Sequence, residues 1–181
     1  FRRVLFRSYT KNPVKSIDDI KGLKLRVPNI TLYTTFAKEC GINGQAMPFA
    51  EVMSSVDQGV IDGGDSPLTD ITSTKVYEKC PQITLTGHIL VIHSLFINEK
   101  LYQSLPDQDK AWFNEAARLA AEDIWKLVQD MDKASIKEIE DHGGTVSEPT
   151  QAMKDHMTEA AKRTWTMFTD SSNDKTYVPN A

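Results

Sequence analysis

The chain contains 181 residues, of which 40% are hydrophobic and 25% are charged, and its formal net charge is −4. This composition is typical of a globular protein with one domain, or with parts of two small ones. The mild acidity argues against nucleic acid as a partner, because nucleic-acid binding needs a basic surface. The most apolar stretch, ITLTGHILVIHSLFIN at 83–98, is broken by Thr, Gly, His and Ser, so it predicts one or two buried strands rather than a membrane-embedded segment.

The N-terminal part predicts a short helix and then a strand that carries a candidate binding residue. A helix is expected at 16–20, followed by Gly22, whose backbone can form a left-handed C-terminal cap. The stretch LKLRVP alternates apolar and charged side chains and stops at Pro28, so 23–27 is expected to form a strand. Arg26 would then lie at the strand end, on the face opposite the apolar side chains.

Helices and strands continue to alternate through the middle of the chain. TLYTTFAKECG predicts a helix that is capped by Thr31 and ended by Gly41, and QAMPF predicts a short strand. AEVMSSVDQG then predicts a helix, and VIDGG predicts a strand that runs into a glycine turn. Ser66 followed by Pro67 predicts a helix start, with a capping hydroxyl and a proline in the first helical position.

The C-terminal half predicts a pair of strands and two amphipathic helices. The strand pair is expected over 83–97, and a helix is expected over 107–142, where apolar and small residues recur at spacings of three and four. A helix of that length would span ~54 Å, which is longer than one small domain is wide. TVSEP predicts a short strand, and 151–169 predicts a last helix. The alternation of strands and helices predicts an α/β fold.

The sequence contains none of the common cofactor or metal motifs: GxGxxG, GxxxxGK[ST], HExxH and CxxC are absent. His88 and His93 fall in a strand pattern on opposite faces, where they cannot share one metal ion. We therefore expect neither a metal nor a cofactor. Cys40 and Cys80 lack metal-type spacing and are interpreted either as two buried free thiols or as one disulfide of an oxidising compartment.

Three features are consistent with anion binding, and each has a simpler structural interpretation. The planar guanidinium of Arg26 suits a carboxylate bidentately, but an ordinary surface salt bridge is the alternative. The helix start at Ser66 offers free N–H groups and the positive end of the helix dipole, or it is an ordinary cap. Phe49 either covers an apolar part of a ligand or belongs to the core.

In their order along the chain, three stretches resemble the substrate-binding proteins of tripartite ATP-independent periplasmic (TRAP) transporters. They are KGLKLRVPN at 21–29, MPFAEVMSSVDQGVIDGGDSPLT at 47–69 and VYEKCPQITLTGHILVIHSLFINEK at 76–100. The resemblance extends from about Ser16 to Gly144, which is most of the chain. It implies the α/β architecture of the periplasmic-binding-protein type, in which two domains close on a small organic acid and a long helix crosses both.

The resemblance also implies ligand contacts. In the family, the arginine of the R-V-P stretch forms the main salt bridge with the ligand carboxylate, and it matches Arg26. Phe49 matches an aromatic residue that lines the pocket. The family often has Glu-Asn-Pro where this chain has D-S-P at 65–67, so Asp65 and Ser66 are candidate contacts, with a hydroxyl in place of the amide.

The resemblance further implies a receptor that binds its ligand without catalysis. Such a receptor would work in the periplasm as a monomer and deliver its ligand to the membrane subunits of the transporter by hinge closure. His93 is the polar candidate in a segment near the domain crossover, although a core histidine is the alternative. One rival interpretation is a small α/β hydrolase or lyase that uses His88 or His93 with Asp62 or Asp65. Another is a free-standing sensor domain.

The first eight residues, FRRVLFRS, do not fit an acidic chain. They translate the string TTC AGA CGT GTG CTC TTC CGA TCT, which looks like a sequencing-adapter oligonucleotide, so we interpret 1–8 as non-native rather than as a basic arm.

The resemblance then implies a fragment that lacks most of the first domain. Residues 9–90 would form the second, ligand-binding α/β domain, and 91–181 would form the crossover strand, the long spanning helix and a C-terminal helical part. Without the first domain, apolar faces of 88–97 and of the long helix would be uncovered. Half a cleft cannot bury most of a ligand, so we expect the chain as written to bind no organic acid with micromolar or better affinity.

Overall fold

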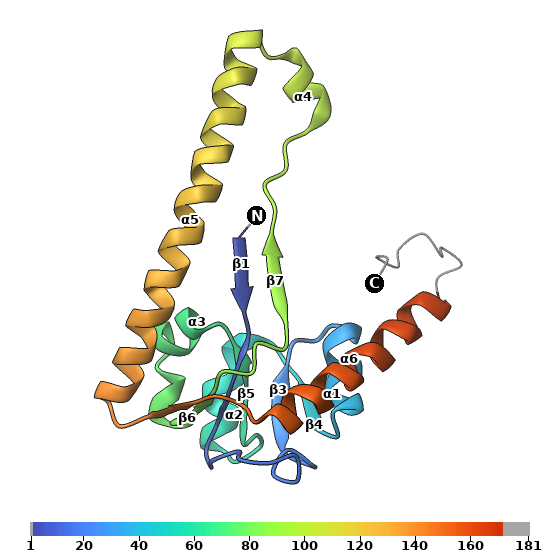
Figure 1. Ribbon diagram of the computed structural model, residues 1–181, viewed down its shortest axis with the longest axis vertical. Helices are drawn as coiled ribbons and strands as arrows, with labels where there is room; N and C mark the ends of the chain where they lie inside the picture. Colours follow the sequence, from blue (N-terminus) through green and yellow to red (C-terminus); the bar gives the residue numbers. More distant parts are fainter. Residues whose placement is uncertain (1, 172–181) are drawn as a thin grey trace.

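The computed structural model describes residues 2–171, apart from the side chains of 2–4, 92, 93, 125 and 167–171. A sheet domain occupies one end of the molecule, and an arm built around one long helix rises from it (Figure 1). The arrangement is a mixed α/β fold, as the alternation of strands and helices predicted.

The sheet domain is organised around a six-stranded mixed sheet. Strand β3 pairs in parallel with β4 and β5, so the carboxyl ends of these three strands lie at one edge of the sheet. Strand β2 runs antiparallel to both of its neighbours, β5 and β6. In spatial order the strands are β4 (Asn43–Ala46), β3 (Lys24–Val27), β5 (Gly63–Ser66), β2 (Arg7–Thr10), β6 (Gln82–Thr84) and β8 (Thr145–Ser147).

Helices cover both faces of this sheet, which gives three layers. On one face lie α1 (Thr31–Glu39) and α6 (Gln151–Ser171), with a core cluster of Ile20, Cys40, Met153, Met157 and Ala160. On the other face lie α2 (Val52–Asp57) and α3 (Leu68–Ser73). The larger cluster there consists of Tyr9, Val52, Val56, Ile61, Leu68, Ile71, Val76, Tyr77, Cys80, Ile83 and Ile139.

The burial of β3 on both faces corrects one expectation. The alternating pattern predicted that Arg26 lies on a polar face, yet Leu25, Arg26 and Val27 are all buried. A strand in the parallel part of a sheet is covered by helices on both sides, so its charged residue is buried as well. The alternative of an ordinary surface salt bridge at Arg26 is therefore wrong.

Three other local predictions differ from the structure. Residues 18–22 form turns instead of a helix. Helix α1 has Ile30 as its N-cap, and no side chain caps it, so Thr31 is not the cap. The two strands expected to pair over 83–97 are β6 and β7 (Leu90–His93), which belong to different sheets.

The arm consists of α5 (Asp107–Asp141), α4 (Glu99–Ser104) and the extended segment between β7 and α4. Helix α5 has 35 residues and confirms the long helix predicted at 107–142. At 1.5 Å per residue it is about 53 Å long. The chain leaves it through Gly143, whose φ of +84° suits glycine. At the base of the arm, β7 pairs antiparallel with β1 (Arg2–Leu5), which leads into β2.

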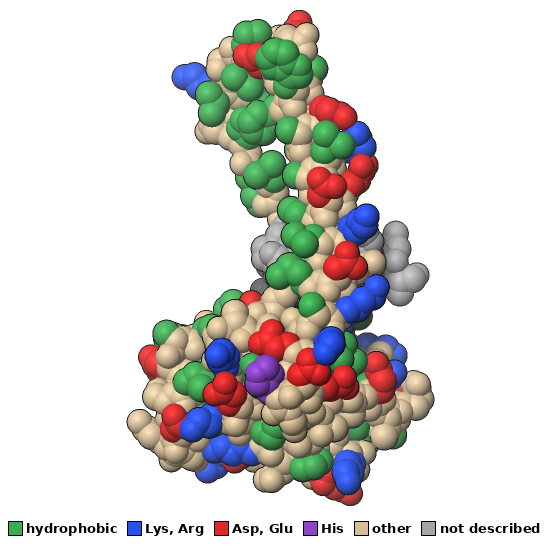
Figure 2. Space-filling model, turned by 90° about the vertical axis from the view of Figure 1, so that its left-hand side faces the viewer, with side chains coloured by type: hydrophobic (Ala, Val, Ile, Leu, Met, Phe, Trp, Pro, Cys, Tyr) green, Lys and Arg blue, Asp and Glu red, His purple; other side chains and the backbone are tan. Residues whose placement is uncertain are grey.

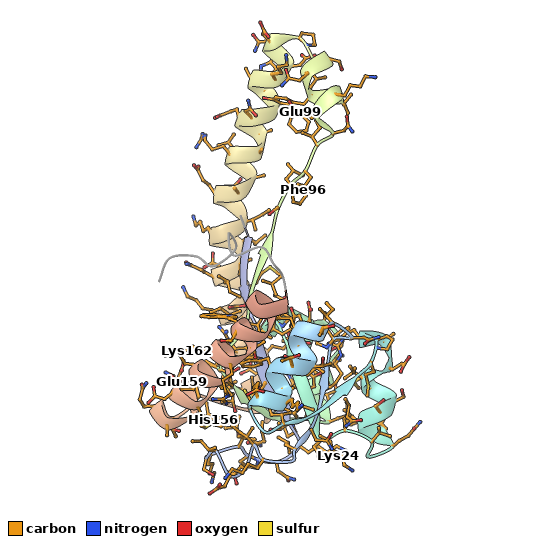
Figure 3. The ribbon with its side chains drawn as sticks, turned by 90° about the vertical axis from the view of Figure 1, so that its right-hand side faces the viewer. Lys24, Phe96, Glu99, His156, Glu159 and Lys162 are labelled. Atoms are coloured by element: carbon orange, nitrogen blue, oxygen red, sulfur yellow. The ribbon has the colours of Figure 1, made fainter. Side chains whose placement is uncertain are left out.

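Apolar side chains gather along the arm (Figure 2). Phe96 and Leu95 on the extended segment are 88% and 74% exposed, and Phe96 lies well away from the sheet domain (Figure 3). Other exposed large apolar residues of the arm are Leu101, Trp112, Phe113, Leu119, Ile124, Leu127 and Met131. The long helix therefore has the uncovered apolar surface that was expected. Among the described residues, no helix has the length and hydropathy needed to cross a membrane.

Both cysteines are buried free thiols in the structure, which agrees with the first of the two interpretations. Burial raises the pKa of Cys80 to about 11 and that of Cys40 to about 12, so both thiols stay protonated and unreactive near neutral pH.

Gly64 is expected to be essential for the packing of the sheet. A Cβ at position 64 would collide with the Tyr9 hydroxyl, and it would lie 2.8 Å from Tyr9 Cζ and 3.2 Å from Arg26 Cβ. Since the ring of Tyr9 is fully buried and cannot move aside, Gly64→Ala should lower the free energy of unfolding by about 2–3 kcal/mol. Chemical denaturation measures this change.

Gly59→Ala is the matched control. Its φ is +72° and its Cβ would meet no atom, so only the conformational cost of about 1 kcal/mol is expected. Equal destabilisation by the two substitutions would contradict the packing argument.

The exposed apolar surface of the arm should make the chain self-associate. Replacing Leu95 and Phe96 together by Ser should reduce concentration-dependent association, as measured by sedimentation velocity, and leave the unfolding midpoint unchanged. Glu99→Ser on the same arm is the control and should not reduce association. Unchanged sedimentation of the double variant would show that this surface does not drive association.

Candidate functional site

Two parallel strands bring candidate residues to one edge of the sheet. Arg26 lies near the carboxyl end of β3, and Asp65 and Ser66 lie at the end of the neighbouring strand β5. Lys24, the first residue of β3, lies on the side of the sheet domain away from the arm (Figure 3). The carboxyl edge therefore faces the arm. In open α/β sheets, ligands bind outside the carboxyl ends of parallel strands.

Arg26 is held by two contacts and has no counter-ion among the described residues. Its Nε–H donates a hydrogen bond to the carbonyl oxygen of Met47 at 3.1 Å, and its guanidinium carbon lies 5.4 Å from the centre of the Phe49 ring. Arg26 is only 7% exposed. Within the described part of the chain, no carboxylate forms an ion pair with it. A buried guanidinium without an anion is unfavourable, so this position is suited to receive a negatively charged group.

The strand register separates the site residues between the two faces of the sheet. Arg26 and Tyr9 both pair with Gly64, so their side chains share the face of the larger core cluster. Asp65 is the next residue of β5 and points to the opposite face. The Tyr9 hydroxyl is buried and has no hydrogen-bond partner among the described residues. Burial raises the pKa of the Tyr9 phenol, the Asp65 carboxylate raises it further and the Arg26 guanidinium opposes both.

On the opposite face, Asp65 is paired with His88. The Nε2 atom of His88 lies 3.2 Å from Asp65 Oδ2, and both side chains are almost fully buried. His88 Nδ1 lies 2.6 Å from the hydroxyl oxygen of Thr86, and the imidazole stacks on the ring of Phe36 with an interplanar angle of 9°. Because a carboxylate only accepts, Nε2 is assigned as the nitrogen that donates to it. The other carboxylate oxygen, Oδ1, has no partner among the described residues.

A narrow recess lies beside Asp65 and His88, on the face of the sheet opposite Arg26. It is lined by Tyr33, Asp65 and His88, together with Ser8, Phe36 and several apolar side chains. Tyr33 lies in α1, which begins shortly after β3 ends. Burial and the Asp65 carboxylate raise the pKa of the Tyr33 phenol, and the Arg26 guanidinium lowers it.

Ser66 differs from its prediction. It is the last residue of β5, and Pro67 occupies the N-cap position of α3 without a side-chain cap. The Ser66 hydroxyl donates instead to the carbonyl oxygen of Asp65 at 2.6 Å. The predicted cap is therefore wrong, because β5 continues for two residues beyond the glycines. A contact of this hydroxyl with a ligand stays a prediction.

The other two predicted residues have different outcomes. Phe49 begins a 3₁₀ turn (Phe49–Glu51), packs against the larger core cluster and presents its ring to Arg26, which agrees with the core interpretation. A contact of this ring with a ligand stays a prediction. The side chain of His93 lies outside the described residues, and its role stays a prediction. His88 precedes β7, so the two histidines do not lie on one strand as the pattern suggested.

In the described part of the chain, no three His, Cys, Asp or Glu side chains form a group that could hold a metal.

Sequence reasoning missed Tyr9 and Tyr33 as members of the site. It considered His88 with Asp65 only for an enzyme and gave His88 no role in a receptor. Tyr33 had a usable signal, because it lies in the first turn of the helix that follows the strand of Arg26. Tyr9 had none, because its place beside Arg26 depends on the register of β2 against β5.

Comparison with known proteins gives a consistent result. The family described as bacterial extracellular solute-binding protein, family 7 (DctP), matches residues 4–171. The sialic acid-binding periplasmic protein SiaP of Vibrio cholerae is 32% identical over 144 residues, which are 79% of this chain and 45% of SiaP.

Solved structures agree with this family. A TRAP periplasmic solute-binding protein from Desulfovibrio desulfuricans, with bound sn-glycerol-3-phosphate, is 51% identical with a TM-score of 0.86. The match covers 94% of this chain and 55% of that one. Another from Haemophilus influenzae, with bound L-gulonate, is 30% identical with a TM-score of 0.83 and covers 95% of this chain and 57% of that one.

The chain spans about half the length of these relatives. Their family consists of solute-binding proteins of transporters and not of enzymes, which overturns the hydrolase or lyase alternative. Since the match includes nearly all described residues, the chain belongs to the bacterial extracellular solute-binding proteins of family 7, the substrate-binding proteins of TRAP transporters.

Proposed function

We propose that this chain supplies the charged half of a cleft that binds a small organic acid anion, with Arg26 as the main ligand contact. The observation that carries this proposal is the burial of the Arg26 guanidinium without a counter-ion in the part of the chain that the structure describes. Its Nε–H is used by Met47, and its two terminal nitrogens make no hydrogen bond with described residues. These groups remain for bidentate contact with a carboxylate or a phosphate.

The surroundings of Arg26 favour an anion for two further reasons. The Phe49 ring and the Met47 carbonyl hold the guanidinium in one orientation, so less side-chain entropy is lost when a ligand binds. Burial lowers the effective dielectric constant, which strengthens the attraction between the guanidinium and an anion. Two relatives were solved with anions of this kind, L-gulonate and sn-glycerol-3-phosphate, which supports the ligand class but does not name the ligand of this chain.

We further propose that the complete receptor works in the periplasm as a monomer and delivers its ligand to TRAP membrane subunits by closure of two domains. Residues 9–90 would then be most of one ligand-binding domain, and 91–181 would connect it to the other. Neighbouring genes for membrane permease subunits would separate this function from that of a free-standing sensor domain.

The proposal that residues 1–8 are non-native bears directly on the site. In the structure residues 2–5 form β1 and residues 7 and 8 begin β2, where Arg7 and Ser8 pair with Ser66 and Asp65. If they are foreign, the natural neighbours of the site on β2 are different side chains. Sequencing the source DNA upstream of the codon for Tyr9 should show a different sequence there. A genomic FRRVLFRS would contradict the proposal and restore the basic-arm interpretation.

Replacement of Arg26 should remove most of the anion affinity. We expect Arg26→Ala to weaken binding of L-gulonate and sn-glycerol-3-phosphate at least ~10-fold, since a charge-assisted hydrogen-bonded pair is lost. The affinity of Arg26→Lys should lie between those of the wild-type chain and Arg26→Ala, because lysine keeps the positive charge but not the planar guanidinium. Because half a cleft binds weakly, the measurement is an NMR titration of the 181-residue chain at millimolar ligand.

Lys24→Ala is the control for Arg26. It removes a positive charge from the same strand at the exposed far end, and it should change the dissociation constant less than ~2-fold. Equal affinity of the wild-type chain and Arg26→Ala, with both folded by their amide spectra, would disprove the role of Arg26.

A further inference from the structure

We infer that Tyr9 is a positioning residue of the anion site: in the bound state its hydroxyl donates a hydrogen bond to the Ser66 oxygen, while the Ser66 hydroxyl donates to the anion. This inference rests on the proposed function, because the anion would lie on Arg26. It adds a residue that does not touch the ligand and acts only through Ser66. Tyr9 is the first residue after the stretch that we propose to be non-native, so it belongs to the natural sequence.

The first argument is that the strand register places the three side chains on one face of the sheet. Arg26 and Tyr9 both pair with Gly64. Ser66 is the second residue after Gly64 on β5, and side chains two positions apart on a strand share a face. Because β5 ends at Ser66, its side chain is nearer to the carboxyl edge than the Tyr9 ring. A ligand that enters at this edge and pairs with Arg26 therefore meets Ser66 before Tyr9.

The second argument is the hydrogen-bond accounting of the two hydroxyl groups. Tyr9 is fully buried, and its hydroxyl has no hydrogen-bond partner among the described residues. A buried hydroxyl without an acceptor is unfavourable, because it loses hydration without replacement. The Ser66 hydroxyl donates its one hydrogen to the carbonyl oxygen of Asp65 at 2.6 Å, and no described group donates to its oxygen. Tyr9 thus has a donor that lacks an acceptor, and Ser66 has an acceptor that lacks a donor.

The third argument is that these two hydroxyl groups lie near each other without being bonded. The Tyr9 ring extends across Gly64, since a Cβ at that position would lie 2.8 Å from Tyr9 Cζ. This brings the phenol hydroxyl over β5, the strand that carries Ser66. Burial raises the pKa of the Tyr9 phenol, and the Ser66 hydroxyl is close enough to oppose that rise. A rotation of the Ser66 side chain can therefore complete the hydrogen bond.

The fourth argument is that an anion supplies the reason for this rotation. An anion on Arg26 is a stronger acceptor for the Ser66 hydroxyl than the neutral carbonyl oxygen of Asp65. Once the Ser66 hydroxyl donates to the anion, its oxygen can accept from Tyr9, and two hydrogen bonds in series strengthen each other. The Tyr9 hydroxyl then gains in the bound state the partner that it lacks in the free chain. Its burial without a partner is a cost of the free chain that ligand binding removes.

The test is a double-mutant cycle of Tyr9→Phe and Ser66→Ala, with sn-glycerol-3-phosphate as the probe. Dissociation constants come from NMR titration of the full 181-residue chain at millimolar ligand. Tyr9→Phe should weaken binding about 3-fold, which corresponds to the loss of one hydrogen bond. In the Ser66→Ala background the same substitution should change the dissociation constant less than ~1.5-fold, because Tyr9 acts only through the Ser66 hydroxyl.

Tyr77→Phe is the matched control for a general effect on structure. Tyr77 is also buried, but its hydroxyl donates to Glu138 Oε1 at 3.0 Å. Its replacement should therefore lower the unfolding midpoint and leave the dissociation constant unchanged. Tyr9→Phe should give the opposite pattern: the free chain loses no hydrogen bond, so the midpoint should not fall, yet the anion binds more weakly. A merely structural role of Tyr9 would not produce this pattern.

The outcomes distinguish this inference from the function on which it rests. Equal affinity of the wild-type chain and Tyr9→Phe, with binding that still depends on Arg26, would overturn the inference alone. A loss on Tyr9→Phe that persists in the Ser66→Ala background, or an equal loss of affinity in Tyr77→Phe, would also overturn it. If Ser66→Ala fails to fold, Ser66→Cys completes the cycle, because a thiol is only a weak donor and acceptor. Failure of the wild-type chain to bind the probe at millimolar concentration would overturn the proposed function and the inference together.

Discussion

The unpaired positive charge of Arg26 is the constraint on which the site depends. Helices cover both faces of β3, so the guanidinium is withdrawn from water, and among the described residues only the Met47 carbonyl and the Phe49 ring compensate it. Neither of them carries a negative charge. Leaving a buried cation in this state costs stability, and an anionic ligand would recover that cost. The same arrangement orients the guanidinium before any ligand arrives, which lowers the entropic cost of binding.

The other unsatisfied polar groups lie on two neighbouring strands, on opposite faces of the sheet. Three buried side-chain atoms lack a partner in the described part of the chain: Tyr9 Oη, Asp65 Oδ1 and Arg7 Nε. All three belong to β2 or β5, but Arg7 lies in the stretch that we propose to be non-native, so only Tyr9 and Asp65 bear on the natural site. Proteins satisfy nearly all buried polar atoms, so local exceptions concentrate where function needs them. Gly64 makes the cluster possible, because any Cβ there would displace the Tyr9 ring from its position beside Arg26.

Sequence reasoning succeeded where one local pattern decides the structure. The long helix was predicted to within one residue, since its periodicity extends over 35 residues and Gly143 marks its end. It failed where tertiary packing decides. The alternation at β3 suggested a polar face, but helices on both sides bury Arg26. The contact of His88 with Asp65 joins residues 23 positions apart, and His88 lies between β6 and β7 in a segment without regular structure, so no local pattern encodes the contact. The family resemblance identified Arg26, but it did not supply its surroundings.

The arm determines how strongly this site can act. It rises from the carboxyl edge of the sheet, beside the charged residues, and its large apolar side chains are exposed (Figure 2). Coulomb attraction at Arg26 grows as water is excluded, while burial of apolar surface is favourable regardless of the ligand. A body that covered the arm and the carboxyl edge together would therefore obtain its free energy of closure mainly from apolar contacts and its selectivity for anions from Arg26. Without such a body less of the ligand surface is removed from water, which is why weak binding is the expected behaviour of the chain by itself.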